Sequence, residues 1–425
     1  MKALRSSKGL LLVAVASLWC IAAQAQESPP GADVESLIAL ARQNNPEYAA
    51  MRYEAEAASE RIQPAGALPD PVLRTELQNV TNYGTGGDFS ILPSQVGSTK
   101  YTVMQDLPFW GKRDLKREVA EAEAASAQGR ADASWTEQAA RIKTAYAQYF
   151  AVTRLIGLVR EVVDLIGRIE GITQVRYAGG LAPQQDAIRV QVERTAMRNE
   201  LIQMENEHRN TRSRINALLA RPAQALLAEP QRLRSVPAAA RLDYAALESR
   251  LRDKNPQLFA DEARIRAAEK NRDLAYRNRY PDFIVGVSPI QTGNTVNMWE
   301  LMFQLNIPLQ QESRRSQERE AEKMIDVARA RKSASANQLL GDLSANLASI
   351  DAARQMESLV QTSLLPQAEL TFQAALAGYE SGKVDFATLL DAQRQIRKAK
   401  QDVIRARAEQ QVRLAEIERL IGEDL

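Results

Sequence analysis

The residues that could perform chemistry are few and scattered. The only histidine, His208, lies in a Glu- and Arg-rich stretch, where we expect a solvated surface residue. The only cysteine, Cys20, lies in an apolar segment near the N-terminus, so thiol catalysis and thiolate metal sites are excluded for the rest of the chain. The carboxylates show no metal-ligand spacing beyond charge pairs on helix faces. The sequence therefore predicts no enzyme, no catalytic residue, no metal site and no cofactor.

The composition is that of long helices. Aromatic residues make up only 5% of the chain, charged residues make up 25%, and the formal net charge is +2. Basic and acidic residues alternate along the expected helix faces, so no basic stripe is available for a polyanion. We therefore expect no nucleic-acid partner.

Residues 1–25 have the features of a secretory signal peptide: a basic start, an apolar stretch over 9–23 and a small-x-small cleavage site ending at Ala25. The alternative is a transmembrane helix, but the apolar stretch is shorter than the roughly 20 residues that a bilayer requires. Trp19 precedes Cys20, whereas a lipoprotein signal has a small residue there, so lipidation is disfavoured. The sequence predicts an exported protein.

The rest of the chain repeats one order of elements twice. Each copy has an Asn-Pro within a helical segment, a Pro-Asp before a strand, a proline after a second strand, and a tyrosine three residues before a glycine. The paired markers are Asn45-Pro46 and Asn255-Pro256, Pro69-Asp70 and Pro281-Asp282, Pro108 and Pro308, and Tyr177 with Gly180 and Tyr379 with Gly382.

These markers predict a first repeat over 26–220, a linker over 221–240 and a second repeat over 241–425. Each repeat has a leading helix, two strands and a long helical hairpin that is reversed at the tyrosine-glycine turn. The predicted segments are a helix over 32–64 with an N-cap at Asp33, strands over 72–80 and 100–107 and a hairpin over 111–220, then a helix over 242–276, strands over 282–290 and 297–307 and a hairpin over 310–422. Pro366 is at most a single interruption of the first helix of that second hairpin.

The strands alternate between apolar and polar residues. Such a strand can face lipid on one side and a lumen on the other, although a half-buried strand of a soluble protein gives the same pattern. Four strands are too few to close a barrel, and open edges are not tolerated in lipid, so a cyclic trimer with twelve strands is the simplest solution. The expected lipid-facing residues are Leu73, Leu77, Trp299, Leu301, Phe303 and Leu305.

The doubled order behind a secretory signal resembles the TolC-type outer membrane factors of tripartite efflux and secretion systems. The segments Gln105–Arg113 and, more weakly, Leu305–Leu309 resemble the family's strand-to-helix junctions. Gly180–Asp186, Tyr379–Gly382 and Leu389–Gln393 resemble its hairpin tips. The resemblance covers residues 33–422.

The resemblance implies a mainly α fold with a small membrane β-barrel portion: two structural repeats, long α-helical hairpins that form an α-barrel, and four strands per chain that complete a 12-stranded barrel as a homotrimer. It implies a passive duct in the outer membrane of a Gram-negative bacterium, with a large periplasmic portion. The implied partners are a periplasmic adaptor (membrane fusion protein), an inner-membrane transporter and outer membrane lipid. Leu68–Pro71 and the junction Pro108–Arg113 further resemble members that serve heavy-metal efflux, so we expect a heavy-metal or multidrug RND system.

The resemblance also assigns roles to residues of the hairpin tips. By position, Tyr379 and Asp186 match a periplasmic gate pair, and Asp391 matches a carboxylate of an acidic ring. Val384 and Thr388 replace an arginine and an aspartate of the best-known member, which implies a weaker latch. The alternative is that Asp186 and Asp391 stabilise the first turns of their helices. The expected adaptor-contacting residues are Tyr177, Gly180, Leu181, Gly382 and Val384.

Two alternatives need no membrane channel. An exported periplasmic adaptor also has a long helical hairpin, but it would carry one hairpin rather than two. A coiled-coil scaffold accounts for the helices taken alone, but it leaves the doubled strand pairs and the apolar face from Trp299 to Ile307 unexplained.

Overall fold

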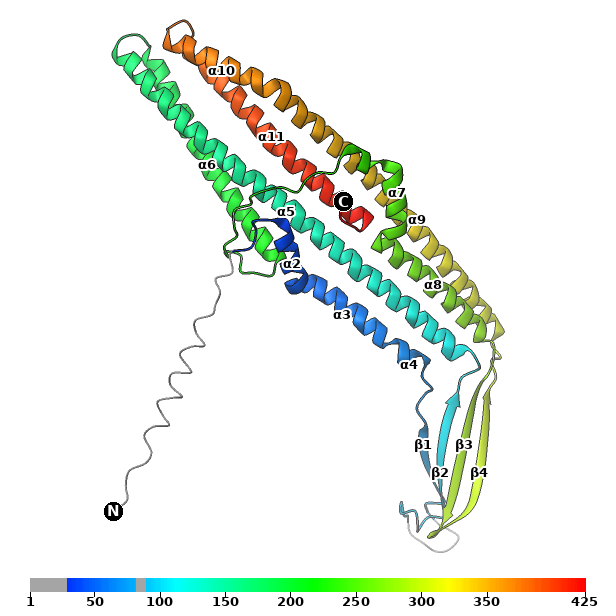
Figure 1. Ribbon diagram of the computed structural model, residues 1–425. Helices are drawn as coiled ribbons and strands as arrows, with labels where there is room; N and C mark the ends of the chain where they lie inside the picture. The colour runs from blue at the N-terminus through cyan, green and yellow to red at the C-terminus, as the bar shows by residue number, and fades with distance from the viewer. Residues whose placement is uncertain (1–28, 82–88) are drawn as a thin grey trace, which may run out of the picture. The chain divides into compact units, whose positions relative to one another are not determined.

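The computed structural model describes residues 29–81 and 89–425, so the expected leader over 1–25 lies outside the described residues. The described residues form a mainly helical fold with four antiparallel strands, which confirms the predicted fold of one chain (Figure 1). Among the described residues, no helix is long and apolar enough to cross a membrane. The elements are α2 Val34–Asn44, α3 Pro46–Glu60, α4 Ile62–Gly66, β1 Val72–Gln78, β2 Ser98–Leu107, α5 Lys112–Ala178, α6 Gln184–Leu218, η1 Ala239–Leu242, α7 Tyr244–Lys254, α8 Pro256–Arg277, β3 Asp282–Thr292, β4 Thr295–Asn306, α9 Gln311–Leu359, the π-helical turn η2 Val360–Leu364, α10 Leu365–Glu380 and α11 Phe386–Ile421.

The chain divides into two compact units, and each unit takes segments from both sequence repeats. Unit 1 comprises Met1–Asn45, Ala139–Pro237 and Ala348–Glu416, and unit 2 comprises Pro46–Gln138, Ala238–Leu347 and Ile417–Leu425. The repeat is therefore a property of the sequence order, whereas the compact units combine matching parts of the two copies.

The first Asn-Pro ends a helix, so the prediction of one continuous helix over 32–64 is wrong. Asn45 has an extended backbone (φ −68°, ψ 117°) because a residue before proline avoids the α region. Its side-chain amide donates to the carbonyl of Leu218 in unit 1 at 2.9 Å. The predicted N-cap of α2 is confirmed, since the Asp33 carboxylate accepts from the Ser36 amide at 2.8 Å.

The second Asn-Pro does the same in unit 2, so the predicted helix over 242–276 is also broken. The Asn255 side chain caps α8 by accepting from the Leu258 amide at 3.0 Å. Its amide group donates to the carbonyl of Leu420 at 2.8 Å. In both repeats, therefore, the asparagine of the Asn-Pro joins the leading helices to the end of the helix that closes the hairpin.

The strands of unit 2 form one antiparallel sheet in the order β1-β2-β3-β4 (Figure 1). The register aligns one apolar row across all four strands: Leu73, Val103, Val287 and Leu301. On the opposite face the hydroxyls of Thr102 and Ser288 are hydrogen-bonded at 2.8 Å. The predicted alternation is therefore present, with one apolar and one polar face.

The segment that follows β2 anchors the sheet to the start of α5 within unit 2. The Lys112 ammonium donates to the Tyr280 carbonyl at 2.9 Å and to the Asp282 carboxylate at 2.8 Å. The Phe109 amide donates to the same carboxylate at 2.8 Å, and the Phe109 ring stacks on Tyr280 with centroids 4.5 Å apart. The Pro-Asp marker before β3 is therefore explained, because its aspartate is the acceptor that holds this junction.

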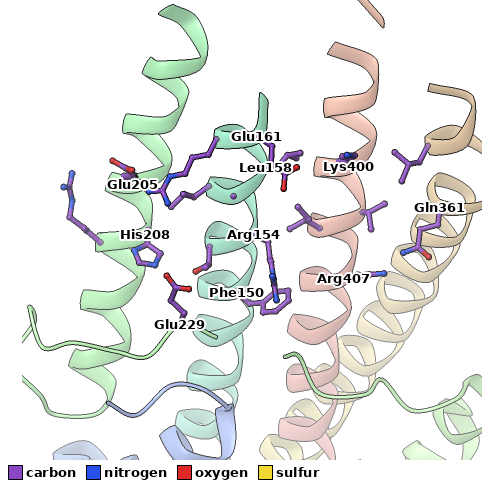
Figure 2. A pocket seen from close by; sticks show the side chains of 18 residues that line it. Phe150, Arg154, Leu158, Glu161, Glu205, His208, Glu229, Gln361, Lys400 and Arg407 are labelled. Carbon is purple, nitrogen blue, oxygen red and sulfur yellow. Dashed lines mark hydrogen bonds and ion pairs between the residues drawn. The ribbon is translucent and has the colours of Figure 1, made fainter. Parts of the chain in front are cut away.

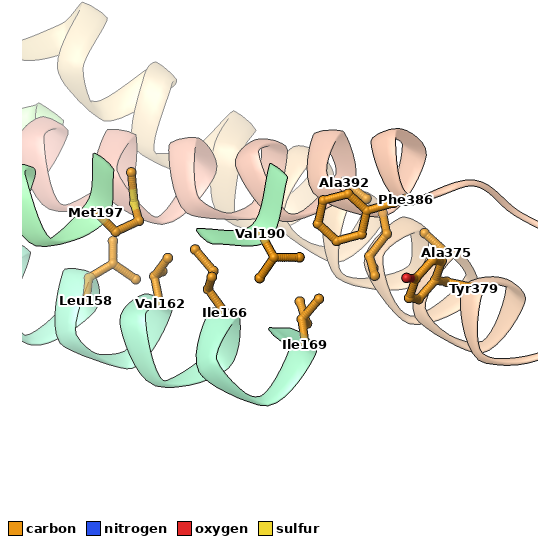
Figure 3. Close-up of a cluster of buried hydrophobic side chains, with 11 residues drawn as sticks. Leu158, Val162, Ile166, Ile169, Val190, Met197, Ala375, Tyr379, Phe386 and Ala392 are labelled. Atoms are coloured by element: carbon orange, nitrogen blue, oxygen red, sulfur yellow. The ribbon is translucent and has the colours of Figure 1, made fainter. Parts of the chain in front are cut away.

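In unit 1, the ends of the two hairpins share an apolar core (Figure 3). Leu158, Val162 and Ile166 of α5 and Val190 of α6 are buried in one cluster with residues of the other hairpin. Tyr379 and Phe386 come from that second hairpin, and their rings meet edge to face at 5.7 Å. Burial of this cluster fixes the tips of one chain against each other.

Pro366 does not end its helix, because a π-helical turn precedes it. Over Val360–Leu364 the helical hydrogen bonds span five residues instead of four, and the Leu365 amide donates to the Val360 carbonyl. A π turn relieves the clash that a proline ring makes with the preceding turn and removes the need for its missing N–H. α10 then continues as far as Glu380.

A residue at the end of α6 yields a test of the repeat. Ala220 has a left-handed φ of +53°, whereas glycine occupies the matching position after α11, where Gly422 has a φ of +76°. Ala220→Gly should raise stability by about 0.5–1 kcal/mol, because glycine adopts this conformation without strain. The measurement is the thermal unfolding midpoint by circular dichroism.

The matched control is Gly422→Ala, which should lower the midpoint. An added Cβ there would lie 2.8 Å from the Lys254 carbonyl oxygen. A lower midpoint for Ala220→Gly would contradict this account of the helix ends.

Candidate functional site

Both hairpin tips turn with the same backbone motif. After α5, the Leu181 amide donates to the Arg176 carbonyl at 2.7 Å and the Gly180 amide donates to Tyr177 at 3.0 Å. Gly180 supplies the left-handed residue, with a φ of +70°. This is a Schellman motif, and it explains why each tip has a glycine three residues after a tyrosine.

The second tip repeats the motif after α10. The amide of Lys383 donates to the Gly378 carbonyl at 2.8 Å, and that of Gly382, whose φ is +74°, donates to Tyr379 at 3.1 Å. Val384 packs over Gly378, where an added Cβ would lie only 2.6 Å from the valine Cγ2. The sequence analysis missed Gly378, although its position in the last turn of a helix was a signal for close packing.

Tyr379 is held inside the tip of its own chain. It is 2% exposed, and its hydroxyl donates to the Thr173 hydroxyl at 3.1 Å. Among the described residues, Tyr379 makes no hydrogen bond to Asp186, so a single chain does not assemble the expected gate pair. Thr173, which is fully buried, is a partner that the sequence analysis did not identify.

Two carboxylates lie near each other at the tips. Asp186 lies in the first turn of α6, and desolvation together with the nearby Asp385 carboxylate raises its pKa against the opposing effect of Arg189. Asp385 accepts from the Thr388 hydroxyl and from the Thr388 amide at 2.9 Å, and these bonds lower the pKa of Asp385. The sequence analysis missed Asp385, although an Asp three residues before a Thr at a helix start is a capping signal.

Asp391 is placed differently. It lies just beyond the first turn of α11, so it does not cap that helix. Its side chain is 70% exposed and lies 3.8 Å from Arg394, whose guanidinium is bound to Glu193 of α6 at 2.6 Å. The Asp391 carboxylate therefore lies mostly in solvent, beside one cation of its own helix.

The other predicted tip residues differ in exposure. Leu181 is 71% exposed and Tyr177 is 46% exposed, whereas Val384 is half-buried against Gly378. On the sheet, the predicted lipid-facing residues lie on the apolar face, and Leu301 reaches 88% exposure. The exposed members are Leu73, Trp299, Leu301, Phe303 and Leu305, while Leu77 is half-buried.

A cavity of about 960 Å³ lies in unit 1 beside α5, α6 and α11 (Figure 2). His208 lines it and stacks on Tyr149 with ring centroids 4.7 Å apart, and burial together with Arg212 lowers its pKa. His208 is half-buried, so it is less solvated than we expected. Arg160 and Glu205 pair at 2.9 Å in the same lining. Among residues 29–81 and 89–425, no group of three His, Cys, Asp or Glu could hold a metal ion.

Comparison with known protein families identifies the family of the chain. The model of the family "Outer membrane efflux protein" matches residues 37–221 and 247–423, which is most of the chain. The chain belongs to the outer membrane efflux protein family. It is an outer membrane efflux channel of a tripartite system in Gram-negative bacteria, with a helical periplasmic part, and it is not an enzyme. The adaptor and scaffold alternatives are thereby set aside.

Solved structures confirm the fold of this outer membrane efflux protein. The outer-membrane channel OprN aligns with a TM-score of 0.79 at 17% identity, covering 92% of this chain and 89% of its own. CusC aligns with a TM-score of 0.79 at 17% identity, covering 92% and 92%. VceC from Vibrio cholerae aligns with a TM-score of 0.78 at 17% identity, covering 92% and 96%. No curated protein sequence matches the chain.

The shared turn motif yields a prediction about the tips. Gly382→Val should strongly reduce efflux-dependent growth, because a β-branched residue at this φ strains the turn by about 1–3 kcal/mol. Trimers should still form, since the strands are unaltered. The matched control is Gly171→Val in α5, where an added Cβ meets nothing within 4 Å. Normal efflux by Gly382→Val would show that this turn is not needed for coupling.

Proposed function

We propose that three copies of this chain, exported by a leader over 1–25, form a passive duct that receives cargo from a periplasmic adaptor and an inner-membrane transporter. Family membership implies the trimeric channel, and the sheet supports how it is completed. The cargo passes through without being bound as a cofactor. The resemblance of Leu68–Pro71 to members that serve heavy-metal efflux remains a prediction about that cargo.

The observation that carries the proposal is the exposed apolar face of the sheet. Leu73 is 67% exposed, Leu301 is 88% exposed and Trp299 is 71% exposed. Large contiguous apolar patches are rare on soluble monomers, and a face of this kind is stable against lipid. The opposite face, with Lys100 bonded to Glu300, suits a water-filled lumen.

The sheet edges support closure by copies. Among the described residues, β1 and β4 each have a neighbouring strand on one side only. Unpaired backbone groups cost several kcal/mol each in lipid, so both edges require partners. Three copies with four strands each supply twelve strands, and β1 of one copy would pair with β4 of the next.

Exposed apolar stripes on the helices of unit 1 support the same assembly. Ile188, Val192 and Ile202 project from one face of α6 by their helical spacing, and each is more than half exposed. Leu359 at the end of α9 and Leu370 in α10 are also exposed. Packing of such stripes between neighbouring copies would close a helical barrel.

We assign the periplasmic entrance to the hairpin tips. The exposed Asp391 carboxylate would form a ring of three charges in a trimer, which attracts cations. Asp186 and Tyr379 are gate candidates, with Tyr379 bonded to Thr173 within the single chain. The exposed Tyr177 and Leu181 and the turns at Gly180, Gly382 and Val384 offer the surface for the adaptor.

The test is single-channel recording of the reconstituted mature protein. We expect small cation-selective currents that a divalent or trivalent cation blocks from the periplasmic side. Asp391→Asn should raise the blocking concentration by roughly tenfold, because it removes the three carboxylates of the ring.

The matched control is Asp326→Asn in α9. Asp326 is 62% exposed and, like Asp391, pairs with a cation three residues away, here Lys323. Folded protein without channel activity would contradict the duct. Equal effects of the two substitutions on the block would contradict the assignment of Asp391 to the ring.

A further inference from the structure

Arg176, in the last turn of α5, connects the two hairpin tips of one chain. Its Nη1 donates to the carbonyl of Glu380 at 2.7 Å, and its Nη2 donates to the carbonyl of Leu181 at 3.3 Å. Its guanidinium carbon lies 5.0 Å from the ring centroid of Tyr379. The guanidinium also lies over the second turn, since Nη2 is 3.4 Å from the position that an added Cβ would take at Gly382.

The contact at Glu380 is favourable for an electrostatic reason. Glu380 is the last residue of α10, and the final carbonyls of a helix lack intrahelical partners and carry partial negative charge. A cation placed there satisfies one carbonyl and interacts well with the helix end. Only arginine has a planar fork that can reach two carbonyls and lie against a ring at once.

The two repeats are asymmetric at this position. Aligning Tyr177 with Tyr379 places Gly378 opposite Arg176, and Val384 packs over that glycine. The first hairpin therefore provides the cation and the second provides the acceptor. The bond to Glu380 therefore joins the two hairpins, while the bond to Leu181 holds the guanidinium over its own turn.

Among the described residues, the bond from Arg176 to Glu380 lies closer to the turns than the ion pairs that join the two hairpins. Farther along the hairpins, Arg394 of α11 binds Glu193 of α6, and Arg397 binds Glu200. Tyr379 and Thr173 add one hydrogen bond in the buried core. The Nε atom of Arg176 is buried and has no acceptor among the described residues, so this contact carries the cost of an unsatisfied donor.

We propose that Arg176 is a clasp that holds the end of α10 against the end of α5 in each protomer and thereby restrains opening of the channel at its tips. The inference rests on the proposed channel function. Opening separates the two tips and requires the guanidinium to leave the Glu380 carbonyl and the Tyr379 ring, so the clasp contributes directly to the balance between closed and open channels.

The experiment compares open probability in planar bilayers for the full mature channel and its variants. Arg176→Ala should raise open probability about tenfold, which corresponds to about 1.4 kcal/mol. Arg176→Lys keeps the charge but not the fork, so it should give an intermediate value. Arg168→Ala removes an exposed cation earlier in the same helix and should leave the open probability unchanged.

The outcomes separate the clasp from the channel itself. Absence of currents from the unaltered protein would contradict the proposed function. Small currents from the unaltered protein with the same open probability in Arg176→Ala would overturn the clasp, as would an equal increase in Arg168→Ala. If Arg176→Ala fails to assemble, Arg176→Lys decides: an intermediate value supports the clasp, and an unaltered value overturns it.

Discussion

A sheet that one chain cannot complete is the constraint on which the rest of the structure depends. Its outer strands β1 and β4 each lack one neighbour among the described residues, and its apolar face is exposed up to 88% at Leu301. Neither feature is stable in a monomer in water or in lipid. The junction at Lys112 and Asp282 holds the base of this sheet to the start of α5, so the part of the chain that needs partners is rigidly attached to a helix.

The duplicated sequence order encodes places where the backbone must change direction. Asn45 follows the end of α2 and Asn255 follows the end of α7. Their side chains donate to carbonyls at the ends of α6 and α11, respectively. Gly180 and Gly382 reverse the hairpins with the same left-handed turn. These devices are local, whereas the compact units combine matching parts of both copies. Differences between the copies, such as Arg176 against Gly378, are therefore where specific functions can arise.

The elements with strong periodicity were predictable from the sequence. The alternation from Trp299 to Leu305, the long helices and the N-cap at Asp33 follow from spacing alone. Continuous helices were wrongly predicted through Asn45 and Asn255, because the restriction that proline imposes on the preceding residue was given too little weight. At the tips, Thr173 and Arg176 were missed because each has a partner in the other hairpin. Asp385 was missed because its role is to cap the start of α11. The exposure of His208 was misjudged, since its stacking partner Tyr149 lies on a different helix.

Cysteine cross-linking at the sheet edges tests whether copies of the chain complete the sheet, because the only native cysteine, Cys20, lies in the expected leader. Arg74→Cys on β1 would be combined in turn with cysteines along the polar face of β4, at Glu300, Met302 and Gln304. We expect oxidation to give covalent dimers and trimers on denaturing gels. The control pair, Thr102→Cys with Ser288→Cys, joins neighbouring strands of one chain and should remain monomeric. Cross-linking of the control pair without any covalent oligomer from the edge pairs would contradict closure by copies.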